Sequence, residues 1–365
     1  MGPLGWLVAG AVGFAVLQVL SLSIVLRWGD ERTVGLRYYG LSTAARNRFK
    51  RTLRIQARLL TPILRLGRRW MRLDFRTAGF QYRGVAGPSG SCSPATFAAA
   101  AAYHPRPEDV FVVTQMKCGT TWMQHLVFEV VHRGRGDLVA TGTTLYSQSC
   151  WLEGRKGVPI DRAPLLGRER PVRIIKTHLP AALCPSDLAA RYIYVARHPV
   201  ACFASCVDFV TTNVGALAPA LPVFEAWFTD PSQMWWGTWP HHVAGWWDRS
   251  VRDGNVLVVL FEDMKRDLPA VVRQVAGYLG IGPLSEPEIS LVVEKCGFGY
   301  MQAHRELFEM HPPHVLQVDA ELFVRGTADR QDDVPAEVRG RIGAWTVREM
   351  AASSFPLARA YPDLA

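Results

Sequence analysis

The junction of a predicted strand, a tight loop and a predicted helix constrains this chain most. Residues 110–122 read VFVVTQMKCGTTW. The β-branched and aromatic run ends at Gln115, a short loop carries Lys117 and Gly119, and an amphipathic stretch covers residues 120–134. Such a junction directs backbone N–H groups and a helix N-terminus at one point, and the lysine adds a positive charge. We therefore expect an anion site, most simply for phosphate. An ordinary turn with a solvated lysine is the alternative.

Three further short apolar runs follow along the chain. They lie at residues 172–177, 191–196 and 255–261. A helix should follow the last run, from about residue 268 to a stop at Gly280, while the region up to about residue 170 should be rich in loops. Strands that alternate with helices predict an α/β fold with a parallel sheet. Ligands of such sheets bind at the carboxyl ends of the strands. The side chains expected there are Lys117, Lys176, His178 and Arg197.

An uncharged run occupies residues 4–26. At about 1.5 Å per residue, a helix of this length crosses the roughly 30 Å hydrocarbon layer of a membrane. No basic region precedes the run and no clear cleavage site ends it, so we expect a membrane anchor over residues 1–27 rather than a cleaved signal peptide. Arginines follow from Arg27 onward, whereas only the α-amino group is basic before the run. The rest of the chain should therefore face the cytoplasm.

The positive charge of the chain is concentrated after this run. Residues 27–83 hold 15 Lys and Arg against 3 acidic residues, so they exceed the net charge of +9 by themselves. We assign residues 28–76 to a basic juxtamembrane segment. Between Arg51 and Leu73 arginines share one face of a predicted helix, leucines share the other, and Pro62 should kink or divide it. Such a helix suits anionic lipid headgroups. Docking on its own catalytic domain is the alternative, and nucleic-acid binding is not favoured.

The remaining chain divides into a linker and one large domain. Residues 77–107 are rich in Gly, Pro and Ala and are interpreted as the linker, which leaves residues 108–365 for the catalytic domain. Seven cysteines without a C-x-x-C pair are expected to be reduced and mostly in the core. No acidic pair predicts a metal site. The tryptophan-rich residues 224–247 have helical spacing, which favours a packed helix over a ligand site.

Several ordered motifs give the chain a family resemblance. The loop QMKCGTTW at residues 115–122 resembles the 5′-phosphosulfate loop of sulfotransferases, usually YPKSGTTW. The segment IKTHLP at 175–180 is similar to that family's KTHLP motif, and YVARHP at 194–199 with Ser205 resembles its 3′-phosphate motif. FEDM and GF follow in the family's order, at residues 261–264 and 297–298. The resemblance spans residues 109 to 326 and is closest to the cytosolic branch.

The resemblance implies a parallel-sheet, P-loop-like sulfotransferase fold and a sulfuryl transfer. The donor would be 3′-phosphoadenosine-5′-phosphosulfate (PAPS), the acceptor a hydroxyl or an amine, and no metal would be required. His178 would be the general base, and an ordinary pKa near 6.5 suits that role. Lys117 would neutralise charge on the 5′-phosphate leaving group, and Lys176 would steady the sulfuryl oxygens.

The resemblance also implies a set of donor-binding residues. Trp122 and Phe298 would enclose the adenine, Arg197 and Ser205 would bind the 3′-phosphate, and Arg325 with Gly326 would close over it. The complete set is Lys117, Cys118, Gly119, Thr120, Thr121, Trp122, Arg197, Ser205, Phe261, Phe298, Arg325 and Gly326.

The chain departs from the family pattern at several of these positions. Met116 and Cys118 replace the usual proline and serine, so a hydroxyl donor is lost from the loop. Phe261 stands where cytosolic members commonly have tyrosine. The C-terminal motif is reduced to VRGTAD at residues 324–329, without its lysine and tryptophan. We expect Cys118→Ser to keep or improve donor affinity. The dimerisation motif is not recognisable, and the sequence does not define the oligomeric state.

These departures leave other functions open. A non-catalytic relative that binds a nucleotide or a membrane partner is the main alternative, and a P-loop kinase or a Golgi enzyme with a lumenal domain are others. The anchor predicts an amphiphilic acceptor, such as a sterol, lipid or hydrophobic phenol. Its pocket would be lined from residues 147–158 and 211–236.

Overall fold

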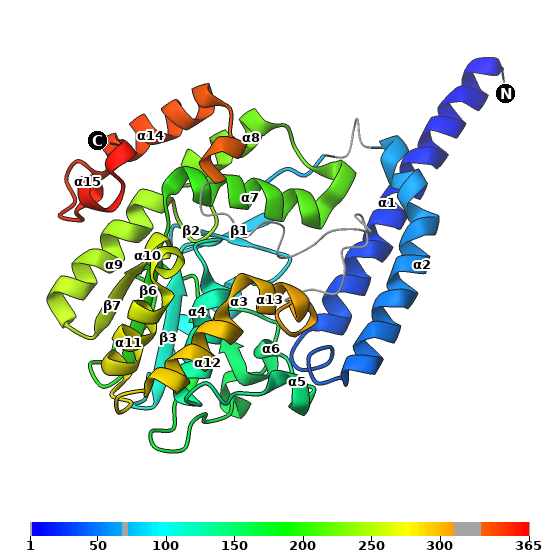
Figure 1. Cartoon of the computed structure of the whole chain (residues 1–365). Helices are drawn as coiled ribbons and strands as arrows, with labels where there is room; N and C mark the ends of the chain where they lie inside the picture. The colour runs from blue at the N-terminus through cyan, green and yellow to red at the C-terminus, as the bar shows by residue number, and fades with distance from the viewer. Residues whose placement is uncertain (1, 68–71, 310–329, 365) are drawn as a thin grey trace.

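The centre of the molecule is a five-stranded parallel sheet. In this computed structural model, which describes residues 2–67, 72–309 and 330–364, the strand order is β4-β5-β3-β6-β7 (Figure 1). The strands are β3 (Asp109–Thr114), β4 (Ser149–Trp151), β5 (Arg173–Thr177), β6 (Arg191–Ala196) and β7 (Val256–Leu260). The predicted α/β fold is confirmed. Of the strands in this sheet, only β4 was not predicted. It is three residues long and lies in the region expected to be rich in loops.

Strand β3 occupies the middle of the sheet and is buried over its whole length. Its register pairs Val113 with Thr177 and Thr114 with Val195. The carboxyl ends of β3, β5 and β6 therefore lie at the same edge. The loops that leave these ends hold the residues that the sequence pattern brings together.

Alternate side chains of β3 enter two hydrophobic clusters on opposite faces of the sheet, as expected for a two-residue period. Helices α4 (Thr120–Val131), α11 (Leu268–Leu279) and α12 (Glu286–Cys296) cover one face. The other cluster lies under α7 (Pro199–Val214), α8 (Leu221–Thr229), α9 (Trp239–Asp253) and α14 (Ala336–Met350). The molecule is therefore a three-layer α/β/α unit (Figure 1).

Short helices complete the unit. They are α3 (Pro94–Ala101), α5 (Leu138–Thr141), α6 (Leu145–Gln148), α10 (Phe261–Arg266), α13 (Phe298–Ala303) and α15 (Leu357–Ala360), with 3₁₀ turns η1 (Ile160–Arg162), η2 (Gly215–Leu217), η3 (Arg305–Leu307), η4 (Arg330–Asp333) and η5 (Pro362–Leu364). Helix α11 ends at Gly280, which has φ +66° as its C-cap. The predicted stop of this helix is confirmed.

The interpretation of residues 77–107 as a linker is wrong. These residues form an antiparallel hairpin, β1 (Gly79–Tyr82) with β2 (Val85–Pro88), followed by helix α3. The hairpin and the helix pack through Phe80 and Phe97, whose ring centroids are 5.0 Å apart, and Phe97 is completely buried. The glycines and prolines belong to turns and caps of this small layer, which composition alone does not distinguish from a linker.

Two long helices precede this unit. Helix α1 (Pro3–Thr33) contains the apolar stretch Pro3–Ser21, the one described helix long and apolar enough to cross a membrane; an N-terminal signal sequence would pass the same test. Helix α2 (Thr43–Gly67) returns antiparallel along it (Figure 1), and the Gln18 side-chain amide donates to the carbonyl of Ile63. The predicted end of this second helix, residues 68–71, lies outside the described residues.

This pairing corrects one expectation for the basic segment. Helix α2 continues through Pro62 without a break, so the proline does not divide it. A helix antiparallel to α1 cannot lie flat in a membrane that α1 crosses. The first part of α2 instead docks on the three-layer α/β/α unit, where the buried Lys50 pairs with Glu309. Docking, the alternative interpretation, describes this part of the helix better.

Candidate active site

The β3–α4 loop has the backbone shape of an anion cradle. Lys117 and Gly119 adopt φ values of +67° and +100°. A Cβ added at Gly119 would lie 2.7 Å from Cδ2 of Phe261, so only glycine fits there. No side chain caps α4 and its first turn holds no acidic residue. The N–H groups of the first turn, from Thr120 onward, are therefore available to an anion.

Lys117 belongs to the cradle loop, and its ammonium lies against helix α7. Its Nζ atom is 4.5 Å from the ring centroid of Phe209 in α7. Burial, reinforced by the positive charges of Arg197 and Arg330, lowers the pKa of Lys117 to about 8. Arg197, which follows β6, donates from Nη1 to the Lys117 carbonyl at 3.0 Å. The ends of β3 and β6 are thus joined through these two residues.

The end of β5 brings His178 to the same edge. Its Nδ1 atom lies 2.9 Å from the Thr114 carbonyl oxygen and 3.2 Å from the Thr114 hydroxyl. A carbonyl oxygen can only accept, so Nδ1 carries the proton and Nε2 is left as an acceptor. Burial and the neighbouring Lys176 hold the pKa of His178 well below its usual value. The imidazole is therefore neutral over the ordinary pH range.

A buried carboxylate fixes the backbone on which His178 stands. Glu153 is completely buried; its Oε1 accepts the His178 backbone N–H at 2.8 Å and its Oε2 accepts the Thr177 hydroxyl at 2.8 Å. Burial raises the pKa of Glu153. The motifs do not mark this residue, although it lies within residues 147–158, which were expected to line an acceptor pocket. Its proximity follows only from the short strand β4.

Lys176 is enclosed by aromatic rings. Its side chain is 3% exposed, and Nζ lies 3.8 Å from the Trp151 ring centroid and 5.7 Å from that of Tyr146. Burial lowers the pKa of Lys176 to about 7, against the attraction of Glu153. A bound anion would favour the protonated form.

Trp236 walls the same space. Its ring centroid is 4.8 Å from that of His178, and its backbone adopts φ +62°, which is unusual for a large side chain. Gln115 holds this loop through its side-chain amide, which donates to the Gly237 carbonyl at 3.2 Å. Trp236 belongs to residues 211–236, which were expected to contribute to an acceptor pocket.

Helix α9 packs against the backbone of the site loops. Trp239, His242 and Trp246 are completely buried, which confirms the prediction of a packed helix. Their ring N–H groups reach backbone carbonyls of the site loops: Trp239 to Arg197 at 2.8 Å, His242 to His178 at 3.0 Å and Trp246 to Leu179 at 3.1 Å. Burial lowers the pKa of His242 to about 4, so it is neutral and donates from Nε2 while Nδ1 accepts from Tyr194 at 2.9 Å.

An aromatic group lies beyond the cradle. The Arg197 guanidinium stacks 4.4 Å from the Phe261 ring centroid, and that ring meets Trp122 edge-on at 5.4 Å. Lys265 Nζ is 5.9 Å from the Trp122 ring and 6.0 Å from the Phe298 ring. The two rings expected to enclose an adenine therefore border the same cation.

The side chain of Cys118 points away from the cradle. It is 1% exposed, and its sulfur lies 3.6 Å from the sulfur of Cys202 in the core beneath α7. The missing hydroxyl at this position would therefore face the interior and not a ligand of the loop. Ser205 lies on α7, buried at 7% exposure. Arg325 and Gly326 lie outside the described residues.

Arg330, which the motifs did not indicate, lies near the cradle. It pairs with Asp208 of α7, three residues after Ser205, and its charge contributes to the lowered pKa of Lys117. No group of three His, Cys, Asp or Glu side chains suited to a metal occurs in the described parts of the chain.

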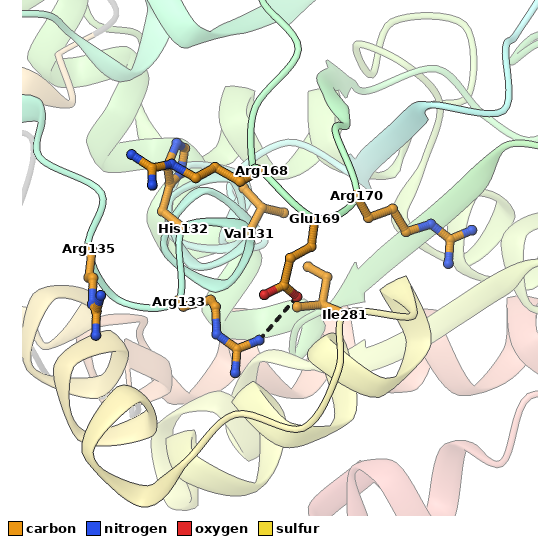
Figure 2. Close-up of a pocket in the computed structure, with 8 residues that line it drawn as sticks. All are labelled: Val131, His132, Arg133, Arg135, Arg168, Glu169, Arg170 and Ile281. Carbon is orange, nitrogen blue, oxygen red and sulfur yellow. Dashed lines mark hydrogen bonds and ion pairs between the residues drawn. The ribbon is translucent and has the colours of Figure 1, made fainter.

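A cavity of about 390 Å³ lies away from these loops, at the end of α4 (Figure 2). It is lined by Val131, His132, Arg133, Arg135, Arg168, Glu169, Arg170 and Ile281. Arg133 reaches Glu169 at 3.4 Å, as the dashed line shows, while Arg135 and Arg170 extend on opposite sides. Val131 is the last residue of α4, so this cavity is at the sheet edge opposite to the cradle and is not part of the site.

A comparison with known families decides the class of protein. Residues 107–353 match the sulfotransferase domain. The chain belongs to the sulfotransferase family. This sulfotransferase is 27% identical over 207 residues to sulfotransferase 1C2 of Oryctolagus cuniculus, covering 55% of the chain and 68% of that relative. It is 25% identical over 292 residues to sulfotransferase 2B1 of Homo sapiens, covering 77% and 73% respectively. The predicted family and its enzymatic class are confirmed.

Solved structures share the fold of this sulfotransferase. A retinol dehydratase in complex with androsterone and the inactive cofactor PAP matches with a TM-score of 0.59 and 20% identity, over 80% of this chain and 97% of that chain. Mouse sulfotransferase SULT7A1 complexed with PAP matches with a TM-score of 0.60 and 20% identity, over 79% and 100% respectively. The five-stranded parallel sheet is thus the sheet of the sulfotransferase fold.

Proposed function

We propose that this sulfotransferase transfers a sulfuryl group from PAPS to the hydroxyl or amine of a hydrophobic acceptor. The observation that carries the proposal is the hydrogen bond from His178 Nδ1 to the Thr114 carbonyl. It leaves Nε2 as a proton acceptor at the edge of the sheet where Lys117 and Lys176 also lie.

His178 acts as the general base. The proton of the acceptor passes to Nε2, and the imidazolium keeps its other proton on Nδ1, which donates it to the Thr114 carbonyl. Glu153 keeps the backbone of His178 in place through its hydrogen bond of 2.8 Å. A base whose pKa is far below 7 is unprotonated at neutral pH but binds a proton weakly. His178 therefore takes the proton as the acceptor oxygen attacks and not before.

The two lysines balance negative charge. When bound, PAPS supplies an activated sulfuryl group, so no metal is needed for activation. Lys117, on the cradle, neutralises the charge of the departing 5′-phosphate, and Lys176, between Trp151 and Tyr146, steadies the sulfuryl oxygens. Backbone N–H groups of α4 complete the cradle.

The rest of the donor is held by the neighbouring elements. Trp122 and Phe298 enclose the adenine, and Phe261 orients Arg197 by stacking at 4.4 Å. Arg197 and Ser205 bind the 3′-phosphate, with the positive charge of Arg330 close by. The proposed closing roles of Arg325 and Gly326 stay predictions from the motif.

The acceptor is hydrophobic and reaches the site from a membrane. The rings of Trp151 and Trp236 lie beside His178, with their centroids 5.8 and 4.8 Å from the centroid of the imidazole ring. Helix α1 exposes apolar side chains such as Leu4 and Leu7, at 75% and 71%, which supports an anchor. In this arrangement residues 1–27 span the membrane and the catalytic domain faces the cytoplasm.

Radiolabelled PAPS tests the chemistry. Full-length protein in liposomes is incubated with labelled donor and a panel of a sterol, a long-chain alcohol and 2-naphthol. We expect labelled product, and a loss of about a hundredfold or more in His178→Ala. His241→Ala, an exposed histidine on α9, is the matched control and should stay active.

Two results would contradict parts of this proposal. Transfer that is unchanged in His178→Ala removes the general-base role. Equal turnover of water-soluble and membrane-partitioned acceptors argues against delivery from a membrane. Absence of transfer to every acceptor, together with retained PAP binding, would instead favour a non-catalytic nucleotide-binding protein.

A further inference from the structure

The chain between the two long helices contacts the loop that carries a site residue. The backbone N–H of Gly35 donates to the Arg155 carbonyl at 2.8 Å, and Val34 and Gly35 each form an isolated β-bridge with Lys156. These partners lie two and three residues after Glu153, which holds the backbone of His178. Residues 34–35 thus add backbone contacts to the loop that carries Glu153.

Tyr39 makes a second contact with the catalytic unit. Its side chain is 1% exposed, and its ring centroid lies 5.7 Å from that of Tyr146. Tyr38 packs against Tyr39 at 5.4 Å and against Phe49 of α2 at 5.7 Å. The three buried tyrosines form a hydrophobic cluster separate from the two sheet clusters. Aromatic contacts of this kind fix ring positions more closely than burial alone.

Tyr146 extends this contact to the reacting groups. Its hydroxyl lies 3.2 Å from the Thr121 hydroxyl in the first turn of α4, and its ring faces Lys176 Nζ at 5.7 Å. Its carbonyl accepts the N–H of Val158 at 2.9 Å, in the same loop as Glu153. A displacement of Tyr146 would therefore move the cradle and the environment of Lys176 together.

Two cations, Arg46 and Lys50, fix the beginning of helix α2 on the catalytic unit. Arg46 donates to the Leu41 carbonyl at 2.6 Å and to the Gly142 carbonyl at 3.4 Å, and Lys50 pairs with Glu309. Arg46 and Lys50 are 1% and 6% exposed. A buried cation is retained only where its partners are in place, so these contacts define one position of the segment on the catalytic unit.

We propose that residues 34–50 form part of the catalytic site, with Tyr39 as a positioning residue that acts through Tyr146 on Lys176 and the first turn of α4. The region that matches the sulfotransferase domain begins at residue 107, so this contribution comes from outside it. The placement of helices α1 and α2 is thereby coupled to sulfuryl transfer. This inference rests on the proposed function of the site.

Three full-length variants in detergent micelles test the coupling: Tyr39→Ala, Tyr39→Phe and Trp6→Ala. The readouts are kcat and acceptor KM with PAPS and 2-naphthol, PAP affinity by calorimetry, and thermal melting. We expect Tyr39→Ala to lower kcat by about fivefold and to leave the acceptor KM within about twofold, because the contact orders the reacting groups and not the acceptor. Tyr39→Phe should restore kcat. Trp6→Ala, at a position that is 68% exposed in the first two turns of α1, should match the wild type.

The outcomes separate this inference from the proposed function. Wild-type kcat and PAP affinity in a folded Tyr39→Ala protein overturn the inference while the proposed function stands. If Tyr39→Ala does not fold, Tyr39→Leu decides, because it keeps a buried apolar side chain and removes the ring contact with Tyr146: a lower kcat supports the inference and a wild-type kcat overturns it. A wild-type protein that neither uses PAPS nor binds PAP overturns the proposed function and this inference together.

Discussion

At the scale of single residues, the two lysines of the site have pKa values close to physiological pH. Burial is the main cause in each, with values of about 8 for Lys117 and about 7 for Lys176. Both shifts are downward, so each ammonium loses its proton as the pH rises through its own value. The free site therefore loses positive charge between about pH 6 and pH 9, and an anion that binds there causes proton uptake by the lysines.

This charge loss predicts a pH dependence of donor-product binding. We expect the affinity for PAP to fall by at least about tenfold between pH 7 and pH 9, since the phosphate groups themselves are already ionised above a second pKa near 6. Calorimetry in buffers of different ionisation enthalpy should also show proton uptake. Lys117→Arg should flatten the part of the profile around pH 8. An affinity that stays constant from pH 7 to pH 9 would contradict the lowered values.

The orientation of Cys118 changes the expectation for its substitution. Because the thiol lies against Cys202 at 3.6 Å in the core, Cys118→Ser places a hydroxyl among buried sulfur and carbon atoms. We expect PAP affinity to be unchanged rather than improved and the free energy of unfolding to fall by about 1 to 2 kcal/mol. Urea unfolding measures the loss, with the buried Cys184→Ser as a matched control for hydroxyl burial. A clear gain in PAP affinity would show that the side chain reaches the ligand.

At the scale of elements, the hairpin and α3 belong to the catalytic unit. The Trp236 backbone N–H donates to the Ala86 carbonyl of β2 at 2.7 Å, so the hairpin holds the loop that walls the site. Phe75, just before the hairpin, stacks on Trp227 with centroids 4.2 Å apart. These contacts give the hairpin both a packing role and a site-supporting role.

Truncated chains test whether the hairpin and α3 are needed for folding. A chain that begins at residue 107, where the family match starts, should lose cooperative thermal unfolding, because removal of each large buried ring costs about 3 to 5 kcal/mol. A chain that begins at Leu73 keeps Phe75 and Phe97 and should unfold cooperatively. Circular dichroism during heating compares the two. Equal melting temperatures would show that the hairpin layer is dispensable for the fold.

The elements that sequence predicted well are those with a strong local pattern. The strands around β3 are continuous apolar runs, and α11 has a periodic apolar face with a glycine stop. By contrast, β4 is too short to show a period, and the hairpin has the composition of a loop.

The residues of the candidate site also differ in how well the sequence predicts them. Residues inside continuous motifs, such as Lys117, His178 and Arg197, lie together because β3, β5 and β6 end at one edge. Glu153 and Trp236 reach the site through long-range contacts that carry no local signal. Their discovery needs the strand order and the loop positions, which are tertiary information.

At the scale of the whole molecule, the apolar helix predicts how the protein fractionates. Full-length protein expressed in cells should remain in the membrane pellet after alkaline carbonate extraction, whereas a chain that begins at residue 28 should be released. The control is a substitution of Leu4 and Leu7 by serine, which shortens the apolar stretch without removing it. Release of the full-length chain by carbonate would show that α1 does not span the membrane.

The burial of all seven cysteines has a practical consequence for such studies. Maleimides react with accessible thiolates, and burial raises the thiol pKa of Cys118 and Cys202, so the native chain should resist labelling. A single cysteine introduced at an exposed position, such as Ser290 on α12, would then be the sole reactive handle. Impermeant reagents could read the sidedness of the catalytic unit in intact vesicles, without any need to remove the natural cysteines first.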